Sequence, residues 1–555
     1  MSRAFPAGIT ILTRLWPWFA AAGSGVLAAI CFPPLSANFL VWIALTPLIA
    51  AIWFSGQNVR RRWLRNLLLG YVSGLVFFTV SFSWLGSLGR LFESLPLYGL
   101  PALLSLYLAM HWAFWAWFAG FIKPRVFTSS WRNLFCALVG ASAWTAHEWL
   151  RGWLFGGFGW NGLGVTQYAN WLLIQICEFT GVGGLSFAIA FFNIVAMTIP
   201  LRLFTEARSR QMRPHWDLNL SVLGIFGLWV YGWNAVGETR PTQPLRVAAI
   251  QPNIAQKEKF QLESSERVFD QLSRLSRPLV QAANPPQLLI WPESATPAPM
   301  VNDEQTYRFV MDFRATSPAD LLLGSDVVDN GQAFNAAVLV PVNADELQVY
   351  RKIHLVPFGE YVPLRHSFPL FAAIAGRWVP GDFGRGQEYS RFVLTTAPVR
   401  IAPLICFEDT IGELTRRFVL PNAWDDRGAD LLVNITNDGW FLHSAGSHQH
   451  LANAVFRCVE TRRPMVRAAN TGVTCFINEF GRVTQTLKDE RGSTFTEGAL
   501  SGVINVPLNG GITFYVLHGE LFSQICAGIT VLTLIALLTG FMRRRRAPAP
   551  ESARS

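Results

Sequence analysis

The sequence predicts a multi-pass α-helical membrane domain joined to an α/β domain outside the cytoplasm. Of the 555 residues, 51% are hydrophobic and only 15% are charged, with 22 Trp and 42 Phe, which is unusual for a soluble protein. Eight apolar runs are long enough to enter a bilayer. Between the seventh and eighth runs, β-rich segments alternate with amphipathic helices, which is typical of a layered α/β domain.

The apolar runs place seven expected spans in the first 238 residues and one near the C-terminus. They are Trp16–Phe32, Phe39–Phe54, Leu67–Leu85, Leu100–Ile122, Leu134–Leu150, Trp171–Leu203, Leu220–Val236 and Leu521–Met542. The sixth run is too long for one span and contains Gly181-Val182-Gly183-Gly184, so we expect a short half-helix before a true span. The expected units are seven transmembrane helices (1–238), a globular domain (239–512), an eighth transmembrane helix (513–545) and a tail (546–555).

Basic residues gather in alternate short loops. The clusters are Arg60, Arg61, Arg62 and Arg65; Lys123, Arg125 and Arg132; Arg202, Arg208, Arg210 and Arg213; and Arg543 to Arg546. The intervening loops hold only Arg90 and Arg151. Because cytoplasmic loops are enriched in Lys and Arg, we expect both termini in the cytoplasm and the globular domain on the opposite side.

The net charge of +10 does not indicate a nucleic-acid partner. Residues 241–515 contain 25 Lys and Arg against 28 Asp and Glu. The positive charge therefore belongs to the membrane part, where topology explains it. We expect no nucleic-acid binding.

The globular domain is expected to alternate strands with helices. The expected strands are Leu245–Ile250, Gln287–Trp291, Leu321–Gly324, Ala336–Pro341, Val399–Ile405, Leu431–Ile435 and Thr474–Asn478. The expected helices are Ser265–Ala282, Glu304–Ala315, Ile411–Val419 and Ser447–Thr461.

Three candidate catalytic side chains follow strands of this domain, where functional groups are usually displayed. Glu293 comes after an apolar strand and Trp291, and desolvation would raise its pKa and make it a better base. Lys352 lies in a Pro- and Gly-containing loop and can supply positive charge to an oxyanion. Taken singly, a helix-capping or turn carboxylate and an exposed lysine explain these two residues better than catalytic roles do.

Cys406 is the candidate nucleophile among seven cysteines. There is no CxxC pair, so zinc and thioredoxin-like sites have no support. Cys406 ends an apolar strand and precedes a helix, whose N-terminus, together with a nearby cation, would lower the pKa of the thiol. The alternative is an inert buried cysteine, which is our interpretation of Cys458 and Cys475. Three cysteines in this domain cannot all pair, so at least one is expected to be free.

The ordered set of Glu293, Lys352 and Cys406 resembles the nitrilase (carbon–nitrogen hydrolase) superfamily. Longer motifs narrow this resemblance to the apolipoprotein N-acyltransferase family of bacterial inner membranes. These motifs are Trp291-Pro292-Glu293-Ser294, His354-Leu355-Val356-Pro357-Phe358-Gly359-Glu360-Tyr361-Val362-Pro363, Cys406-Phe407-Glu408 and Asn437-Asp438-Gly439-Trp440-Phe441. The resemblance covers nearly the whole chain and implies a nitrilase-like αββα sandwich for residues 239–512.

This resemblance implies a two-step acyl transfer without a cofactor. Cys406 would take an acyl chain from a phospholipid, typically phosphatidylethanolamine, and pass it from a thioester to the α-amine of the diacylglyceryl-cysteine of an apolipoprotein, the last step of lipoprotein maturation. Glu293 would be the general base and acid, and Lys352 the oxyanion stabiliser. The catalytic domain would face the periplasm.

Further residues take supporting roles in this scheme. Glu360 would orient Lys352 or assist proton transfer, and Glu408 would support the surroundings of the nucleophile. Two positions depart from the family: Phe407 stands where Tyr is frequent, and Phe260 where Trp is common.

We expect a lid over the site. An apolar run follows the loop that carries Lys352 (the lysine loop, residues 351–363) and comprises Leu364, Phe368, Leu370, Phe371 and Trp378. This run predicts a segment that admits the acyl chain from the bilayer. Phe260, Trp378 and Trp440 are the candidate residues for substrate contact.

Polar residues outside these motifs have structural interpretations. His147 and Glu148 lie near the outer end of the fifth span, and we expect Glu148 to pair with Arg151. His443, His448 and His450 match no common zinc spacing, so we expect helix-capping and packing roles and no metal.

Two other functions compete with acyl transfer to a lipoprotein. A membrane-tethered amidase would use the same residues with water as the acceptor. A transporter or receptor with an inactive outer domain is disfavoured, because all three catalytic residue types are present.

Overall fold

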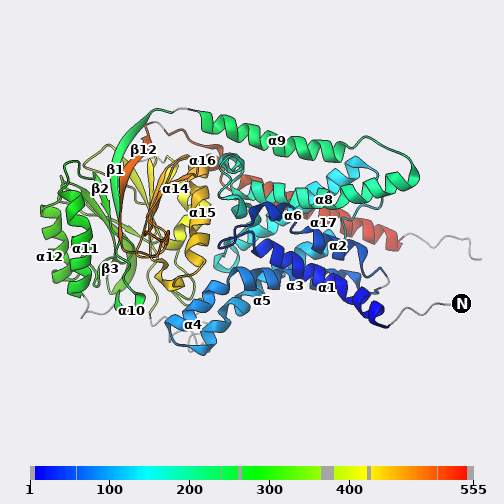
Figure 1. Cartoon of the computed structure of the whole chain (residues 1–555), viewed down its shortest axis with the longest axis horizontal. Coiled ribbons are helices and arrows are strands. Elements are labelled where there is room, and N and C mark those ends of the chain that lie inside the picture. Colours follow the sequence, from blue (N-terminus) through cyan, green and yellow to red (C-terminus); the bar gives the residue numbers. More distant parts are fainter. Residues whose placement is uncertain are drawn as a thin grey trace, which may run out of the picture.

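The protein has a helical part and an α/β part, side by side along its long axis (Figure 1). The computed structural model describes residues 7–57, 59–238, 240–259, 265–363, 365, 381–421, 427–508 and 510–546. The helical part combines the N-terminal helices with the last helix of the chain. This arrangement confirms the predicted fold class.

The helical part contains a set of α-helices joined by short 3-10 segments. The α-helices are α1 (Ala7–Ala29), α2 (Thr46–Phe54), α3 (Arg62–Ser81), α4 (Ser87–Leu91), α5 (Leu100–Ala119), α6 (Ser130–Arg151), α7 (Cys177–Thr180), α8 (Val182–Ser209), α9 (Trp216–Gly237), α16 (Phe514–His518) and α17 (Leu521–Arg546). The 3-10 segments are η1 (Asn38–Trp42), η2 (Ser83–Gly86), η3 (Leu95–Gly99), η4 (Leu154–Gly156), η5 (Leu163–Gln167) and η6 (Leu173–Ile176). The predicted break in the sixth run lies at Gly181, where φ is +61° and α7 ends.

Five helices in the described part of the chain are long and apolar enough to cross a membrane: α3, η3 with α5, α8, α9 and α17. The protein is therefore a multi-pass membrane protein. The predicted second span is a 3-10 turn followed by the nine-residue α2, only ~14 Å of α-helix. The count of eight spans stays a prediction.

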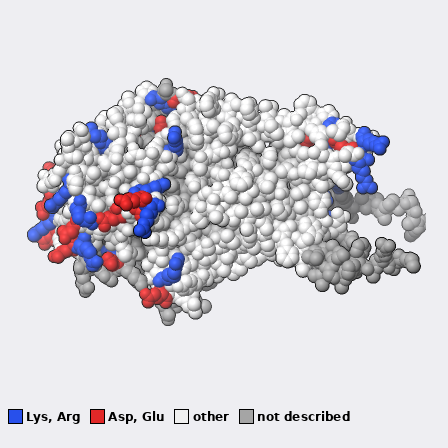
Figure 2. Space-filling model, in the orientation of Figure 1, with Lys and Arg blue, Asp and Glu red and all other residues white. Residues whose placement is uncertain are grey.

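Charge is nearly absent from the middle of the helical part. Figure 2 shows a broad band without Lys, Arg, Asp or Glu on the visible face, with charged residues at both ends of the molecule. A charge in hydrocarbon is costly, so the band has the chemistry of a bilayer-embedded surface.

The α/β part contains two six-stranded sheets. Their strand orders are β12-β1-β2-β3-β4-β5 and β11-β10-β9-β8-β7-β6. The first sheet comprises β1 (Thr242–Gln251), β2 (Leu288–Ile290), β3 (Asp320–Asp329), β4 (Gln332–Val340), β5 (Gln348–Arg351) and β12 (Gly498–Pro507). The second comprises β6 (Phe392–Val393), β7 (Arg400–Ile405), β8 (Leu431–Thr436), β9 (Met465–Ala469), β10 (Cys475–Ile477) and β11 (Val483–Thr486).

Helices cover the two sheets and complete the expected αββα sandwich (Figure 1). On the side away from the membrane lie α11 (Ser265–Val280) and α12 (Glu304–Ala315), and the short α10 (Gln256–Lys259) lies beside the sheets. On the membrane side lie α14 (Gly412–Val419) and α15 (Gly446–Thr461). Helix α15 is buried almost throughout, because it lies between the second sheet and the membrane helices.

A buried ion cluster fastens α8 to α9. Arg202 is 1% exposed, and its guanidinium lies 2.8 Å from Glu206 and 2.8 Å from Asp217. Asn133 on α6 donates to the same Asp217 at 2.7 Å. The cluster therefore joins three helices at the end of the bundle farthest from the sandwich.

Replacing Arg202 with Met should strongly destabilise the protein, because the buried Glu206 and Asp217 would lose the guanidinium that both face, and His215 contacts only Glu206 among these two carboxylates. Loss of one partner of a buried pair costs about 3–5 kcal/mol. The thermal unfolding midpoint in detergent checks this, with Arg208→Met, an exposed position on the same helix, as the matched control. Equal midpoints for the two variants would contradict the role of the cluster.

Candidate active site

The structure brings the three predicted catalytic residues together from both sheets. Glu293 follows β2, Lys352 follows β5, and Cys406 follows β7 of the facing sheet. Lys352 Nζ lies 3.7 Å from Glu293 Oε1. The charges of Glu293 and Lys352 both act on the Cys406 thiol, so the three groups form one electrostatic unit.

Lys352 is a buried cation held by two carboxylates. Its side chain is 1% exposed, and its Nζ donates to Glu360 Oε1 at 2.8 Å. Burial by itself lowers the pKa of this lysine, but the charges of Glu360 and Glu293 outweigh it, so the net shift is upward. Lys352 therefore remains charged at neutral pH.

Asn335 on β4 separates the two carboxylates. Its Nδ2 donates to Glu293 Oε1 at 2.9 Å and to Glu360 Oε1 at 2.8 Å. The backbone N–H of Val356 donates to Glu360 Oε2 at 2.7 Å. Sequence reasoning missed Asn335, because no motif marks it and its role depends on neighbours from two other loops.

Glu293 keeps one carboxylate oxygen free. The residue is 5% exposed, and within the described structure its buried Oε2 has no hydrogen-bond partner. The backbone is anchored as well, because Lys259 Nζ donates to the Glu293 carbonyl at 2.7 Å. A Cβ on Gly324 would lie 2.6 Å from Glu293 Cα, so only glycine permits this close approach. Glu293 is thus a fixed carboxylate with an oxygen available for a proton.

Cys406 has a strained backbone and a protonated thiol. Its φ of +52° is costly for a residue with a side chain. Burial, followed by the charge of Glu293, raises the pKa of the thiol, while Lys352 and a hydrogen bond from Thr436 lower it. The net shift is upward, so the expected low thiol pKa is wrong: burial outweighs the lowering by Lys352. The thiol needs a base, and Glu293 is the carboxylate whose charge acts on it most strongly.

Glu408 ties the lysine loop to the strand of the nucleophile. Its Oε1 accepts from the Tyr350 hydroxyl at 2.9 Å and from the backbone N–H groups of Ile353 and His354 at 2.8 and 3.0 Å. Its Oε2 accepts from the Ile405 N–H at 2.9 Å. Burial raises the pKa of Glu408 to about 7. This carboxyl group sets the distance between the Lys352 and Cys406 loops.

The ring of Phe407 packs between the membrane part and the lysine loop. It stacks on Phe158 and Trp160 at centroid distances of 6.2 and 6.0 Å, and on His354 at 5.8 Å. Phe158 and Trp160 belong to the glycine-rich loop after α6 (residues 156–164). The contacts at position 407 are therefore made by the aromatic ring of Phe407.

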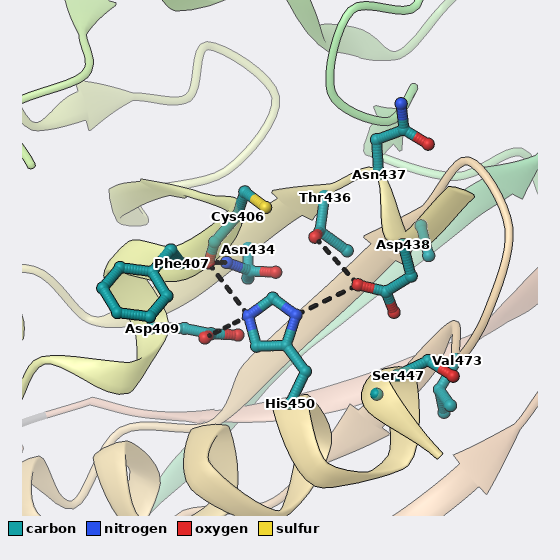
Figure 3. A network of polar contacts seen from close by, with 12 residues as sticks. Cys406, Phe407, Asp409, Asn434, Thr436, Asn437, Asp438, Ser447, His450 and Val473 are labelled. Atoms are coloured by element: carbon teal, nitrogen blue, oxygen red, sulfur yellow. Dashed lines mark hydrogen bonds and ion pairs between the residues drawn. The ribbon is translucent and has the colours of Figure 1, made fainter. Parts of the chain in front are cut away.

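A buried charged network lies behind the nucleophile (Figure 3). His450 Nδ1 lies 3.0 Å from Asp438 and its Nε2 lies 2.8 Å from Asp409, while Arg467 is 3.1 Å from Asp438. The capping role expected for His450 is therefore wrong, because the histidine faces two carboxylates that lie far from it in sequence. His443, in contrast, stacks on Phe495 at 4.5 Å, which is a packing role.

The remaining candidates have separate outcomes. Trp440 packs on Phe92 of the membrane part at 6.3 Å, at the junction of the two parts. Phe260 and Trp378, together with Leu364, Phe368, Leu370 and Phe371, lie outside the described residues.

Glu148 does not pair with Arg151 as expected. Its Oε1 accepts from Trp144 Nε1 at 2.7 Å and from the Leu163 N–H at 2.9 Å. Arg151 donates to the Trp160 carbonyl at 3.0 Å. Both side chains thus hold the glycine-rich loop in place.

Two protein-family models match the chain. The apolipoprotein N-acyltransferase N-terminal domain matches residues 24–195, and carbon-nitrogen hydrolase matches residues 246–503. These matches correspond to the helical part and to the sandwich.

Similarity to curated proteins extends over nearly the full length. An apolipoprotein N-acyltransferase of Geobacter metallireducens is 35% identical over 92% of this chain and 94% of its own. The proteins of the same name from Chlorobaculum tepidum and Nitrosomonas europaea are 30% and 33% identical, over 94% and 86% of this chain and 96% and 89% of their own. The similarity therefore spans both parts of the molecule.

Replacing Lys352 with Met should make Cys406 react with iodoacetamide only at higher pH, because the cation that lowers the thiol pKa is lost. Close opposite charges shift a pKa by ~1–3 units. Glu293→Gln should move the profile the other way, since that carboxylate raises the thiol pKa. Mass spectrometry of the Cys406 peptide measures both shifts, with exposed Lys488→Met as the control. Unchanged profiles would show that the charges of Lys352 and Glu293 do not affect the pKa of the Cys406 thiol.

Proposed function

The chain belongs to the apolipoprotein N-acyltransferase family, and from this premise we propose that Cys406 carries an acyl group from a phospholipid to a lipoprotein amine. The donor is a diacyl phospholipid, typically phosphatidylethanolamine. The acceptor is the α-amine of the N-terminal diacylglyceryl-cysteine of an apolipoprotein. The arrangement of Glu293, Lys352 and Cys406 supports both steps.

The first half-reaction makes a thioester. Glu293 Oε2 takes the thiol proton, and the thiolate sulfur attacks the ester carbonyl of the phospholipid. Lys352 stabilises the tetrahedral oxyanion. The intermediate collapses with loss of the glycerol oxygen, which receives the proton from Glu293, so the products are acyl-Cys406 and a lysophospholipid.

The second half-reaction makes an amide. The α-amine attacks the thioester carbonyl and loses a proton to Glu293, with Lys352 again beside the oxyanion. The Cys406 sulfur leaves and takes that proton back. The enzyme thus returns to its resting thiol form, which agrees with the upward pKa shift of Cys406.

The neighbouring groups serve this chemistry by positioning. Glu360 and Asn335 restrict Lys352 and Glu293 Oε1 to one arrangement. Glu408 holds the lysine loop against the strand of Cys406. We assign Trp440, Phe260 and Trp378 to the entry of the acyl chain, Trp440 because it lies against Phe92 of the membrane part.

The cellular placement follows from the same proposal. The multi-pass helical part lies in the bacterial inner membrane, the nitrilase-like domain (239–512) is periplasmic, and both termini are cytoplasmic. The positive loops support this orientation, and the charge-free band of Figure 2 supports the placement of the helices in a bilayer. Donor and acceptor are both anchored in the bilayer that the helices occupy.

The observation that carries the proposal is the free oxygen of Glu293. In the part of the chain that the structure describes, this buried carboxylate has one oxygen engaged by Asn335 and Lys352 and the other without a hydrogen-bond partner, so it is prepared to move a proton. Its charge acts on the thiol that requires deprotonation.

Purified protein mixed with acyl-labelled phospholipid should form a labelled adduct that hydroxylamine removes, because a thioester is cleaved by this nucleophile. Cys406→Ala should form none, whereas Cys475→Ala, a buried cysteine of the same domain, should form it normally. Glu293→Gln should slow adduct formation by ~10²–10⁴-fold, the usual contribution of a general base.

The fate of the adduct separates acyl transfer from hydrolysis. A diacylglyceryl-cysteine peptide with a free amine should discharge the label as an amide. Absence of the adduct in the native protein would contradict the proposal, and discharge to water alone would favour the amidase.

A further inference from the structure

Gln449 on α15 is inserted among residues of the membrane part. Its Oε1 accepts from Trp84 Nε1 at 3.0 Å, from Trp160 Nε1 at 3.2 Å and from Asn161 Nδ2 at 3.0 Å. Its Nε2 donates to the carbonyls of Pro33 and Ser81 at 2.9 and 3.1 Å. One amide of the catalytic domain thus binds five groups of the membrane part.

Loss of the Gln449 hydrogen bonds would be energetically costly. Gln449 is 2% exposed, and its partners come from four separate segments of the helical part. A buried donor or acceptor left without a partner costs about 1–3 kcal/mol. Replacement of the amide would leave two indole N–H groups and the Asn161 amide without their shared acceptor. The contact therefore fixes one position of α15 against the membrane part.

The next residue of the same helix holds the nucleophile. His450 Nε2 lies 3.2 Å from the backbone carbonyl of Cys406, and Asn434 Nδ2 lies 3.0 Å from the same oxygen. These two groups fix the peptide plane that follows the strained φ of Cys406. In Figure 3, the imidazole lies between this carbonyl, Asp409 and Asp438.

The charge of His450 balances its surroundings. Asp409, Asp438 and Arg467 face it from η8 (Cys406–Thr410), η9 (Asp438–Phe441) and β9, and the Cys406 thiol lies beyond. Although burial lowers the pKa of His450, Asp409 and Asp438 raise it to about 9. Arg467 Nη2 also lies 2.8 Å from His450 Nδ1. When His450 is protonated, two carboxylates, one imidazolium and one guanidinium form a neutral set. Loss of the imidazolium would leave a net negative charge near the thiol.

We propose that Gln449 and His450 are positioning residues that fix Cys406 relative to the membrane: Gln449 sets the register of α15 against the membrane part, and His450 transmits it to the Cys406 carbonyl. Two adjacent side chains on one helix thereby connect the bilayer-embedded helices to the reacting sulfur. The inference rests on the proposed use of a lipid donor, because only a donor held in the bilayer makes this register matter.

Two acyl donors separate positioning from chemistry. Full-length variants in nanodiscs are given a labelled bilayer phospholipid or the water-soluble ester p-nitrophenyl butyrate, which any competent thiolate can attack. Gln449→Leu should lower the rate of adduct formation from the phospholipid about 10–100-fold, the cost of a displacement near 1 Å, with the soluble ester little affected. His450→Gln should lower both rates, because it acts on the nucleophile itself.

A readout independent of turnover tests His450. Its replacement by Gln should move the iodoacetamide profile of Cys406 to higher pH, since a negative charge then remains beside the thiol. His448→Gln, on the same helix but outside the network, is the matched control and should keep the native profile. An unmoved profile in His450→Gln would overturn its role, whether or not phospholipid is the donor.

Matched variants keep the Gln449 test decisive. Gln175→Leu also removes a bond between the two parts, from Nε2 to the Phe480 carbonyl at 2.9 Å, and should keep the native ratio of the two rates. If Gln449→Leu does not fold, Trp84→Phe removes one of the three donors to Gln449 Oε1 and should show a smaller selective loss. Equal loss with both donors, or no loss, would overturn the proposal. No adduct from phospholipid in the native protein would instead contradict the proposed function.

Discussion

The structure depends on the burial of α15 on all sides. A helix between a β-sheet and a membrane bundle has no water to satisfy its polar side chains, so each must find a partner within the protein. Gln449 binds the membrane part, His450 binds two carboxylates, and Arg457 pairs with Glu460 at 2.7 Å. Arg462, just after the helix, reaches Glu178 of α7 at 2.8 Å. The bonds of Gln449 and Arg462 join the sandwich to the membrane helices at fixed points, whereas those of His450 and Arg457 stay within the sandwich.

The same constraint shapes the catalytic cluster. Burial favours the neutral form of a thiol and of a lysine, yet Lys352 remains charged because Glu293 and Glu360 flank it. Of the two carboxylates that stabilise the cation, Glu293 also raises the pKa of the Cys406 thiol. The resting site therefore holds a neutral thiol, a base and a fixed cation. The Cys406 thiolate forms when a substrate is present for it to attack.

The bilayer imposes the complementary pattern on the helical part. On the face shown in Figure 2, charged groups lie at its ends, and the buried Arg202 is paired with Glu206 and Asp217. Near the sandwich, Glu148 and Arg151 bond to the glycine-rich loop. That loop carries Phe158 and Trp160, which stack on Phe407 beside the nucleophile. Polar groups of the membrane part thus support the catalytic site from the side of the membrane helices.

The sequence by itself determined the features that are local. Long apolar runs indicated the helices, alternating segments indicated the sandwich, and motifs at strand ends identified Glu293, Lys352 and Cys406. Strands β5, β6, β9, β11 and β12 were missed, because they are short or depend on pairing with partners distant in sequence. Only the tertiary structure decided that Asn335 bridges two carboxylates, that burial raises the thiol pKa, and that Gln449 binds the membrane part while His450 lies against the Cys406 carbonyl. Each of these depends on groups tens or hundreds of residues apart, and contacts of that kind are set by packing and desolvation, to which local sequence patterns do not respond.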